Sequence, residues 1–349
     1  MSDSFQLAPG TVLGRYRIVS EIGRGNNGIV YLAHQDMLDR QVACKVLLPE
    51  YANDKKYTTG FFREARIAAK ISHPNVVQAL DVGAINGVCF FIMEYVEGEM
   101  LEKIRKKAPE KLTPSFILHI AIQLAEALDY AWRCNKMIHG DIKPENILIR
   151  PDGEVKLADL GVARIAGTAT HNELMATPLY VAPELLTDGA GTPDPRSDIY
   201  SFGVMLYELC SGEAPFKGKM EELLEHHINT LPEPLLRRNP DMNISMAALV
   251  DRMLAKSPAE RPQSWQEIVE TLKNIQQSEL STVQTTIAAP APADAAEPGP
   301  GKISVVIAIL AVLAGILIGL LMIRFAKPQN ETIDDGDVEA LTLELKQNK

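Results

Sequence analysis

The sequence lacks the features of several common protein classes. Its 35 Lys and Arg residues are outnumbered by 45 Asp and Glu residues, which gives a net charge of −10 and leaves no general cationic surface for nucleic acid. Only four cysteines occur in 349 residues, and their wide spacing is unlike that of a zinc site or a disulfide framework. They are Cys44, Cys89, Cys134 and Cys210. We therefore expect no nucleic-acid partner, and four reduced thiols in a cytosolic compartment.

The amino-terminal end also lacks a secretory signal. Residues 1–15 contain no apolar run behind a basic start, so we expect no cleavable signal peptide and a first domain that stays in the cytoplasm. The chain shows no internal repeat. Its length allows two or three structural units, of which at least one has a sizeable core.

One long apolar run stands near the carboxyl end. Residues 303–323 are 21 uncharged and almost wholly apolar residues between two basic ones. A helix of that length reaches about 30 Å, the thickness of the hydrocarbon core of a bilayer. We predict a single transmembrane helix, with a buried core helix as the alternative. Ala311, Gly315 and Gly319 recur at four-residue steps, a spacing that lets two helices approach closely, so a homodimer through this span is a candidate assembly.

The composition divides the chain around this run. Before the run, a stretch rich in Pro, Ala, Ser and Thr has too few large apolar side chains to bury a core, which predicts a flexible linker. After the run, an acidic tail is too short to form a stable helix alone. The predicted segments are an N-terminal extension at 1–15, a folded domain at 16–275, a linker at 276–302, the span at 303–323 and the tail at 324–349.

The folded domain changes character along its length. Its first part, about 16–96, has short runs of β-branched and apolar residues that predict strands, such as 41–48. Its second part, about 97–275, has apolar residues at three- and four-residue steps from Ile117 to Ala131, which predict an amphipathic helix. We therefore expect an α+β protein with a small β-rich lobe before a larger helical lobe.

Three glycines lie between the first two expected strands. Gly23, Gly25 and Gly28 add little side-chain bulk, so that a hairpin can lie close over a phosphate chain. The alternatives are an ordinary glycine-rich hairpin and a dinucleotide-binding turn, although the latter requires a helix directly after the glycines. Another strand is expected there instead.

Several charged and polar residues within or next to apolar segments are candidate functional residues. Lys45 lies in the third expected strand, where an ammonium group needs an anionic partner, and Glu64 in the following helix is a candidate for that partner. Asp141 and Asn146 lie in a polar segment between a helix and a strand, and Asp159 follows the next strand. Asp and Asn oxygens suit a hard cation that bridges phosphates, and Asp141 is then left to accept the proton of an attacking hydroxyl. For each residue alone, a solvated charge or a turn-forming role is the plainer interpretation.

The combined order of these motifs resembles that of a eukaryotic-type, or Hanks-type, protein kinase. The glycine loop, strand lysine, helix glutamate, His-x-Asp-x-x-x-x-Asn, Asp-x-Gly and Ala-Pro-Glu at 182–184 follow one another over about 16–275. Ser-Asp-Ile-Tyr-Ser-Phe-Gly at 197–203 is similar to the buried central helix of that family, and Arg261 to the partner of its Ala-Pro-Glu glutamate. The resemblance is to bacterial membrane-anchored serine/threonine kinases, and it implies a bilobal kinase fold.

The resemblance also implies ATP and magnesium as cofactors, and Ser/Thr hydroxyls of proteins as acceptors, including those of the chain itself. Nucleotide contacts are expected at Ile22, Gly23, Gly25, Gly28, Val30, Lys45, Glu64, Glu94 and Val96, the last two in a segment similar to the hinge that holds adenine. Asn146 and Asp159 correspond to the magnesium ligands. Asp141 corresponds to the catalytic base, and Lys143 together with Thr177 indicates the Ser/Thr-specific branch.

Three positions depart from the family pattern. Gly140 stands where many relatives have Arg, Leu160 where most have Phe, and Ala176 where Gly is usual. None of the three removes an atom that takes part in the transfer. The alternative function is that of a pseudokinase or nucleotide-binding scaffold without phosphotransfer, and the retained Lys45 and Asp141 argue against it. A receptor that acts outside the membrane is disfavoured, because only about 26 residues follow the span.

Two opposing arguments bear on the orientation of the span. Lys302 precedes it, whereas Arg324 and Lys327 follow it. Because basic residues that flank a span are enriched on the cytoplasmic side, this difference weakly favours a carboxyl end in the cytoplasm. A kinase domain, however, needs the ATP of the cytoplasm, and one extra charge is a small bias. We expect a single-pass protein of the bacterial inner membrane with residues 1–302 in the cytoplasm.

Overall fold

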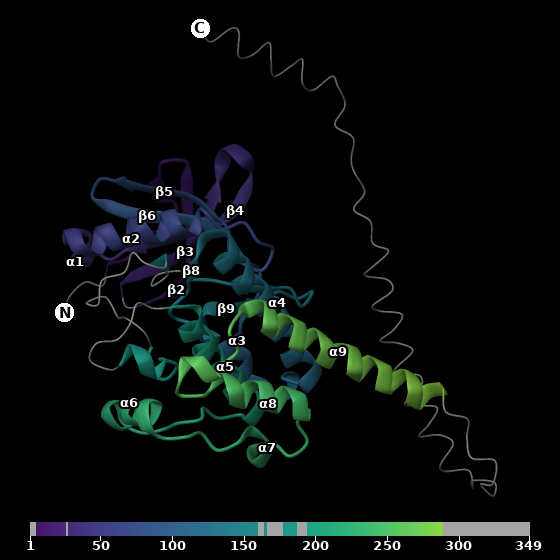
Figure 1. Ribbon diagram of the computed structural model, residues 1–349. Helices are drawn as coiled ribbons and strands as arrows, with labels where there is room; N and C mark the ends of the chain where they lie inside the picture. The colour runs from purple at the N-terminus through teal and green to yellow at the C-terminus, as the bar shows by residue number, and fades with distance from the viewer. Residues whose placement is uncertain (1–4, 26, 160–163, 166–176, 187–193, 289–349) are drawn as a thin grey trace, which may run out of the picture. The chain divides into compact units, whose positions relative to one another are not determined.

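The structure is a computed structural model that describes residues 5–25, 27–159, 164–165, 177–186 and 194–288 (Figure 1). Two compact units are distinguished, Met1–Gln284 and Thr285–Lys349. The predicted span and tail lie outside the described residues, as do Leu160 and Ala176. Within the part of the chain that is described, no helix is both long and apolar enough to cross a membrane.

A six-stranded antiparallel sheet forms the first lobe, in the order β1-β2-β3-β4-β6-β5. Its strands are β1 Val12–Leu13, β2 Tyr16–Arg24, β3 Gly28–Gln35, β4 Arg40–Leu47, β5 Ala79–Ile85 and β6 Val88–Glu94. From Ile29 onward, the side chains of β3 alternate between buried and half-buried positions, the period of a strand with one face on a core. That core includes Ile18, Tyr31, Val42 and Ile92.

The described part of the N-terminal extension packs against this sheet. Leu13 is buried in β1, and Phe5 and Leu7 contact the apolar core. The backbone N–H of Leu7 donates a hydrogen bond of 2.9 Å to the hydroxyl of Tyr31. Residues 5–15 therefore form an edge of the first lobe.

Two helices follow β4, α1 Pro49–Ala52 and α2 Lys55–Ala68. α2 begins where the side chain of Asp54 accepts a hydrogen bond from the backbone N–H of Lys56, which is an N-cap. The helix buries Phe61 and Ala65 in the lobe, and Glu64 lies among these buried residues. A carboxylate is thus held inside the first lobe, where it needs a cation.

Helices make up most of the second lobe. They are α3 Leu101–Lys107, α4 Pro114–Asn135, α5 Pro195–Ser211, α6 Met220–Asn229, α7 Leu235–Arg238, α8 Ile244–Met253 and α9 Trp265–Ala288. Short strands form two small sheets, in the orders β10-β9-β7 and β11-β8. Their bounds are β7 Glu99–Met100, β8 Met137–Ile138, β9 Ile147–Ile149, β10 Val155–Leu157 and β11 Arg164–Ile165. Single 3-10 turns along the chain are η1 Asp36–Leu38, η2 Pro109–Lys111, η3 Pro144–Asn146, η5 Pro183–Leu185 and η6 Pro258–Glu260.

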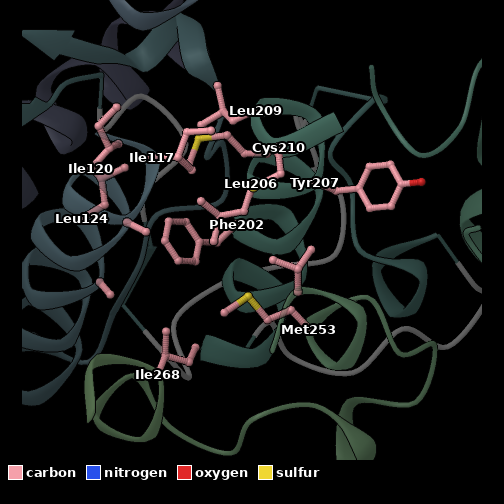
Figure 2. Packing of buried hydrophobic residues seen from close by; sticks show 14 of the residues in the cluster. Ile117, Ile120, Leu124, Phe202, Leu206, Tyr207, Leu209, Cys210, Met253 and Ile268 are labelled. Carbon is pink, nitrogen blue, oxygen red and sulfur yellow. The ribbon is translucent and has the colours of Figure 1, made fainter. Parts of the chain in front are cut away.

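The core of the second lobe forms around α4 and α5. Figure 2 shows Ile117, Ile120 and Leu124 of α4 beside Phe202 and Leu206 of α5. The three- and four-residue spacing of apolar residues in the sequence correctly predicted α4, because Ile117, Ile120 and Leu124 all lie on the buried face of this helix.

α5 is buried over almost its whole length. Every residue from Ser197 to Cys210 is buried. Gly203 permits the close approach of α8, because a Cβ at this position would lie 2.6 Å from the Cβ of Met253. α5 is therefore the central, buried helix of the second lobe. Its polar side chains can form hydrogen bonds to the loops that surround it.

α9 continues beyond the expected end of the folded domain. Trp265, Ile268, Leu272 and Ile275 are buried in the core of the second lobe. The helix then runs on to Ala288, so residues 276–288 are helical although their composition predicts a flexible linker. The physical reason is that a helix already nucleated on a packed core extends without a second nucleation step. The β-rich first lobe and the helical second lobe confirm the α+β, bilobal prediction.

Candidate active site

The three glycines form the tight end of the β2–β3 hairpin. The backbone N–H of Gly25 donates a hydrogen bond of 2.9 Å to the carbonyl of Gly28, and Gly23 pairs with Val30 across the strands. A Cβ at Gly28 would lie 2.8 Å from the carbonyl oxygen of Val46, so only glycine fits there without a shift of the backbone. Ile22, just before the glycines, is exposed. This hairpin is the strand–loop–strand that the sequence favours over a dinucleotide-binding turn.

Lys45 lies in β4, between β3 and β6. Its Nζ is 2.9 Å from Glu64 Oε1 and 3.0 Å from Asp159 Oδ1, and its side chain is only 13% exposed. Burial alone would lower the pKa of Lys45, but the charges of Asp159 and Glu64 outweigh it and raise the pKa above its ordinary value. Lys45 therefore stays protonated. The pair with Glu64 that the sequence suggests is present, and Asp159 joins it.

The polar segment after β8 gathers a second group of side chains. Asp141 Oδ2 is 2.6 Å from Lys143 Nζ and accepts a hydrogen bond of 3.0 Å from Asn146 Nδ2. Its Oδ1 accepts a hydrogen bond of 2.6 Å from the hydroxyl of Thr177. Lys143 Nζ in turn donates to Thr177 Oγ1 at 2.7 Å. The carboxylate of Asp141, the ammonium group of Lys143 and the hydroxyl of Thr177 therefore all contact one another, and both oxygens of the carboxylate are held in place by hydrogen bonds.

The two groups are joined through the backbone. The N–H of Ala158, next to Asp159, donates a hydrogen bond of 2.8 Å to the carbonyl of Asn146. Asp159 has a φ of 56°, a left-handed conformation that is strained for a non-glycine residue and is typical of functional sites. The carboxylate of Asp159 and the amide oxygen of Asn146 are hard oxygen donors of the kind that magnesium binds. Among the described residues, no group of three or more His, Cys, Asp or Glu side chains is arranged to hold a metal ion.

Asp198 of α5 fixes the start of the polar segment. Its carboxylate accepts hydrogen bonds from the backbone N–H groups of His139, at 2.6 Å, and Gly140, at 2.8 Å. Burial raises the pKa of Asp198, although His139 and the two N–H donors oppose the shift. Sequence reasoning assigned no role to this residue. The available signal was an acidic residue at the start of a mostly apolar helix.

The expected hinge lies at the end of β6. Glu94 donates its backbone N–H to the carbonyl of Gln78 at 2.9 Å, and its carboxylate is 2.9 Å from Nζ of Lys156. The Lys156 side chain is only 8% exposed, so this ion pair ties β10 to β6. Within the described residues, the N–H of Val96 has no backbone partner, which leaves it available to a ligand. Lys156 is a residue that the sequence reasoning missed.

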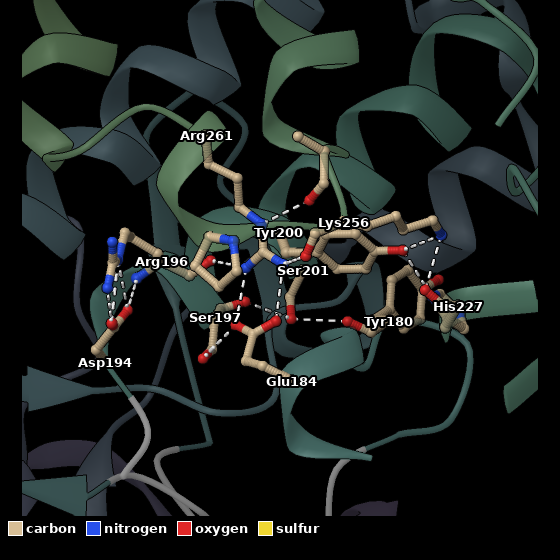
Figure 3. Close-up of polar contacts among 12 residues, drawn as sticks. Tyr180, Glu184, Asp194, Arg196, Ser197, Tyr200, Ser201, His227, Lys256 and Arg261 are labelled. Carbon is tan, nitrogen blue, oxygen red and sulfur yellow. Dashed lines mark hydrogen bonds and ion pairs between the residues drawn. The ribbon is translucent and has the colours of Figure 1, made fainter. Parts of the chain in front are cut away.

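Glu184 of η5 is anchored by Arg261, as Figure 3 shows. The guanidinium is fully buried and donates from Nη1 to Oε1 at 2.8 Å and from Nη2 to Oε2 at 2.7 Å. Ser197 Oγ donates a further hydrogen bond of 2.9 Å to Glu184. The Arg261–Glu184 ion pair can be accommodated in the protein interior because each charge has a hydrogen-bonded partner. Removal of either residue would leave the other charge unpaired and destabilise the fold.

Comparison with known proteins identifies the family. The protein kinase domain model matches residues 16–272, so the chain belongs to the protein kinase family. It is 36% identical over 267 residues to serine/threonine-protein kinase PrkC of Bacillus subtilis, a match that covers 75% of this chain and 40% of PrkC. It is 37% identical over 272 residues to a probable serine/threonine-protein kinase of Clostridium acetobutylicum, which covers 76% of this chain and 41% of that protein. The chain therefore spans about two fifths of the length of these curated relatives.

Solved structures agree with this assignment. The kinase domain of Mycobacterium tuberculosis PknI has a TM-score of 0.61 and 29% identity, over 77% of this chain and 99% of that one. The apo form of PpkA-294 has a TM-score of 0.64 and 27% identity, over 76% and 99%. The resemblance inferred from the motifs is thus confirmed, and the fold is the bilobal protein kinase fold.

Proposed function

We propose that the chain is an ATP-dependent protein kinase that transfers the γ-phosphoryl group to serine and threonine hydroxyls of proteins, including its own. The observation that carries the proposal is the cluster of Asp141, Lys143 and Thr177 beside Asn146, with distances of 2.6 to 3.0 Å. The hydroxyl of Thr177 already donates a hydrogen bond to Asp141 Oδ1, so this carboxylate is accessible to a hydroxyl group. The serine/threonine-protein kinases among the relatives support the same function.

The residues divide the chemistry between them. Lys45, fixed by Glu64, would hold the α- and β-phosphates, and the glycine hairpin would cover them through backbone N–H groups. Asn146 and Asp159 would hold magnesium, which neutralises charge on the phosphates when it is bound. The backbone N–H of Val96 and the carbonyl of Glu94 would hold adenine.

Asp141 and Lys143 act at the acceptor. Asp141 would orient the Ser/Thr hydroxyl and take its proton as the new bond between oxygen and the γ-phosphorus forms. The bond between that phosphorus and the bridging oxygen breaks, and ADP leaves with the electron pair. Lys143, 2.6 Å from Asp141, would stabilise the charge that develops on the transferring phosphoryl group.

Phosphate transfer by the full-length chain tests this proposal. With radiolabelled ATP and magnesium, wild type is expected to label itself and an added protein acceptor. Asp141→Asn should abolish transfer while the thermal unfolding midpoint stays close to that of wild type, because it removes a charge and keeps the size of the side chain. Lys45→Met should also abolish transfer and leave the domain folded, but with a lower midpoint, because the buried Glu64 carboxylate loses its cation. Lys70→Met and Asp241→Asn, both at exposed positions, serve as matched controls. Wild-type activity in Asp141→Asn would refute the assigned base.

The principal alternative is a pseudokinase that binds nucleotide without transferring phosphate. It would require a missing group on the transfer path, whereas Lys45, Asp141, Asn146 and Asp159 are all present and their contacts are formed. A wild-type chain that binds ATP and magnesium but labels no acceptor would favour this alternative.

We also propose that residues 303–323 anchor the kinase domain to the inner membrane with residues 1–302 in the cytoplasm. The 21-residue apolar run supports the anchor, and the need of a kinase domain for cytoplasmic ATP supports the orientation. The full chain should sediment with membranes and resist extraction by high salt, whereas a variant that lacks 303–323 should not. Equal solubility of the two would contradict the anchor.

A further inference from the structure

A half-buried lysine, Lys256, contacts the end of α6. Lys256 follows α8, and its Nζ donates hydrogen bonds to the backbone carbonyls of His227, at 2.7 Å, and His226, at 3.0 Å. Both carbonyls belong to the last turn of α6, where helical carbonyls attract cations, and the His226 carbonyl also accepts a hydrogen bond of 3.1 Å from the Thr230 N–H. The same Nζ lies 4.5 Å from the ring centre of Phe216. Lys256 therefore ties the end of α6 to the body of the second lobe.

Tyr200 of α5 stands between this lysine and the arginine that anchors Glu184. Lys256 Nζ is 5.8 Å from the centre of the Tyr200 ring, and Arg261 Cζ is 4.9 Å from it, both within the range of cation–π attraction. The Tyr200 hydroxyl is 2.9 Å from Nδ1 of His227, a fully buried residue of α6 (Figure 3). One tyrosine thus contacts α6 through its hydroxyl and the Glu184 anchor through its ring.

These contacts reach the segment that carries Thr177. Ser201 Oγ, next to Tyr200 in the chain, donates a hydrogen bond of 2.7 Å to the carbonyl of Tyr180. The Tyr180 hydroxyl donates to Glu208 of α5 at 2.7 Å. Two side chains of α5 therefore hold Tyr180, a residue of the segment 177–182. Within the described residues, no hydrogen bond or ion pair joins Lys256, Tyr200 or His227 to Lys45 or Glu64 on the nucleotide side.

We propose that Lys256, acting through Tyr200 and His227, is a positioning residue for the protein acceptor: it fixes α6 and the segment 177–182 relative to Asp141 and leaves the nucleotide side unaffected. The inference rests on the proposed kinase function, because it assigns a part of the protein to one of the two substrates of that reaction. The pattern of contacts carries it: Lys256, Tyr200 and His227 join α5, α6 and the arginine that anchors Glu184, and within the described residues none of them bonds to Lys45 or Glu64.

The test separates the two substrates in the full-length chain. Lys256→Met is compared with wild type for phosphorylation of casein and for ATP hydrolysis without a protein acceptor. We expect kcat/KM for casein to fall by about tenfold or more, while KM for ATP and the hydrolysis rate change by less than about twofold. Lys256→Arg keeps the charge and should recover much of the loss. Lys273→Met, which removes an exposed ion pair with Glu126, is the control.

Two outcomes would overturn the inference. An equal fall in casein phosphorylation and ATP hydrolysis would show a general structural role, and no change in either would show no role. Amide hydrogen exchange gives a readout that does not depend on activity: Lys256→Met should exchange faster at 177–182 and 220–229, with 40–48 unchanged. If the wild-type chain phosphorylates nothing, the proposed function fails, and unchanged or uniformly faster exchange still refutes the positioning role.

Discussion

Asp198 and Gly140 are joined by a hydrogen bond of 2.8 Å from the Gly140 N–H to Asp198 Oδ1, although 58 residues separate them in the chain. The second oxygen of the same carboxylate holds the N–H of His139. The central helix of the lobe thus sets the conformation of the residue just before Asp141. The geometry of the candidate base is fixed by a residue that does not touch the substrate.

Asp198→Asn tests this relationship. The side chain keeps its size, but its NH₂ group would face one of the two backbone donors, which leaves that donor unsatisfied in a buried place. We expect a loss of about 3 kcal/mol in the free energy of unfolding, measured by denaturant titration, together with a fall in phosphate transfer. Asp194→Asn at the start of α5 is the control, since its side chain is half-exposed and its surface ion pair contributes at most about 1 kcal/mol. Equal losses in the two variants would contradict the assigned role.

Gly140→Ala should destabilise the fold. Gly140 has a φ of 78°, a left-handed conformation in which a Cβ costs about 1 to 2 kcal/mol. Gly60→Ala makes a matched comparison, because Gly60 lies within α2 and a Cβ there would meet nothing within 4 Å. Alanine at position 60 should stabilise the helix by about 0.5 to 1 kcal/mol. Opposite signs in denaturant titrations support the argument, and a neutral Gly140→Ala would refute it.

The absence of an arginine at position 140 bears on regulation. The guanidinium of an arginine at position 140 could bind a phosphorylated residue in the segment from Asp159 to Glu184. Glycine has no side chain that could form this contact. Thr168 and Thr170, candidate phosphorylation sites in that segment, lie outside the described residues. We expect activity without their phosphorylation, and expect Thr168→Ala/Thr170→Ala to lower the rate by less than about tenfold. A hundredfold loss that acidic replacements restore would instead identify a phosphate switch.

His227 should make the stability of the fold depend on pH. Burial, aided by the nearby charge of Lys256, lowers the pKa of His227 to about 4 from an ordinary value of 6.5, against an opposing effect of the Leu179 backbone. The unfolded chain therefore binds a proton more readily than the folded one between these values, and stability falls as the pH falls from 6.5 toward 4. The full shift corresponds to about 3 kcal/mol. The free energy of unfolding of His227→Gln should depend less steeply on pH in this window, and parallel profiles would contradict the assignment.

Self-association of the predicted span is a separate expectation, at residues outside those described. Ala311, Gly315 and Gly319 would let two helices approach on one face. Gly315→Ile/Gly319→Ile should then reduce cross-linking of the full chain in membranes. Cross-linking yields that do not differ from wild type would exclude this interface.

Much of the site could be predicted from residue order and local physics alone. Lys45 in an apolar strand required an anionic partner, and Glu64, on the buried face of α2, is that partner. The spacing of apolar residues from Ile117 to Ala131 likewise predicted α4, because apolar residues at three- and four-residue steps lie on one face of a helix.

Other contacts were decided only by the tertiary structure. Thr177 reaches Asp141 across 36 residues, and Asp198 reaches Gly140 across 58. Lys156 of β10 pairs with Glu94 of β6, a strand of another sheet, and no local pattern of the sequence predicts that pairing. The helical state of 276–288 follows from a packed core earlier in α9, whereas the composition of those residues argues for a linker. Sequence periodicity and chemistry determine which side chains need partners; the packing of distant elements determines which partners they find.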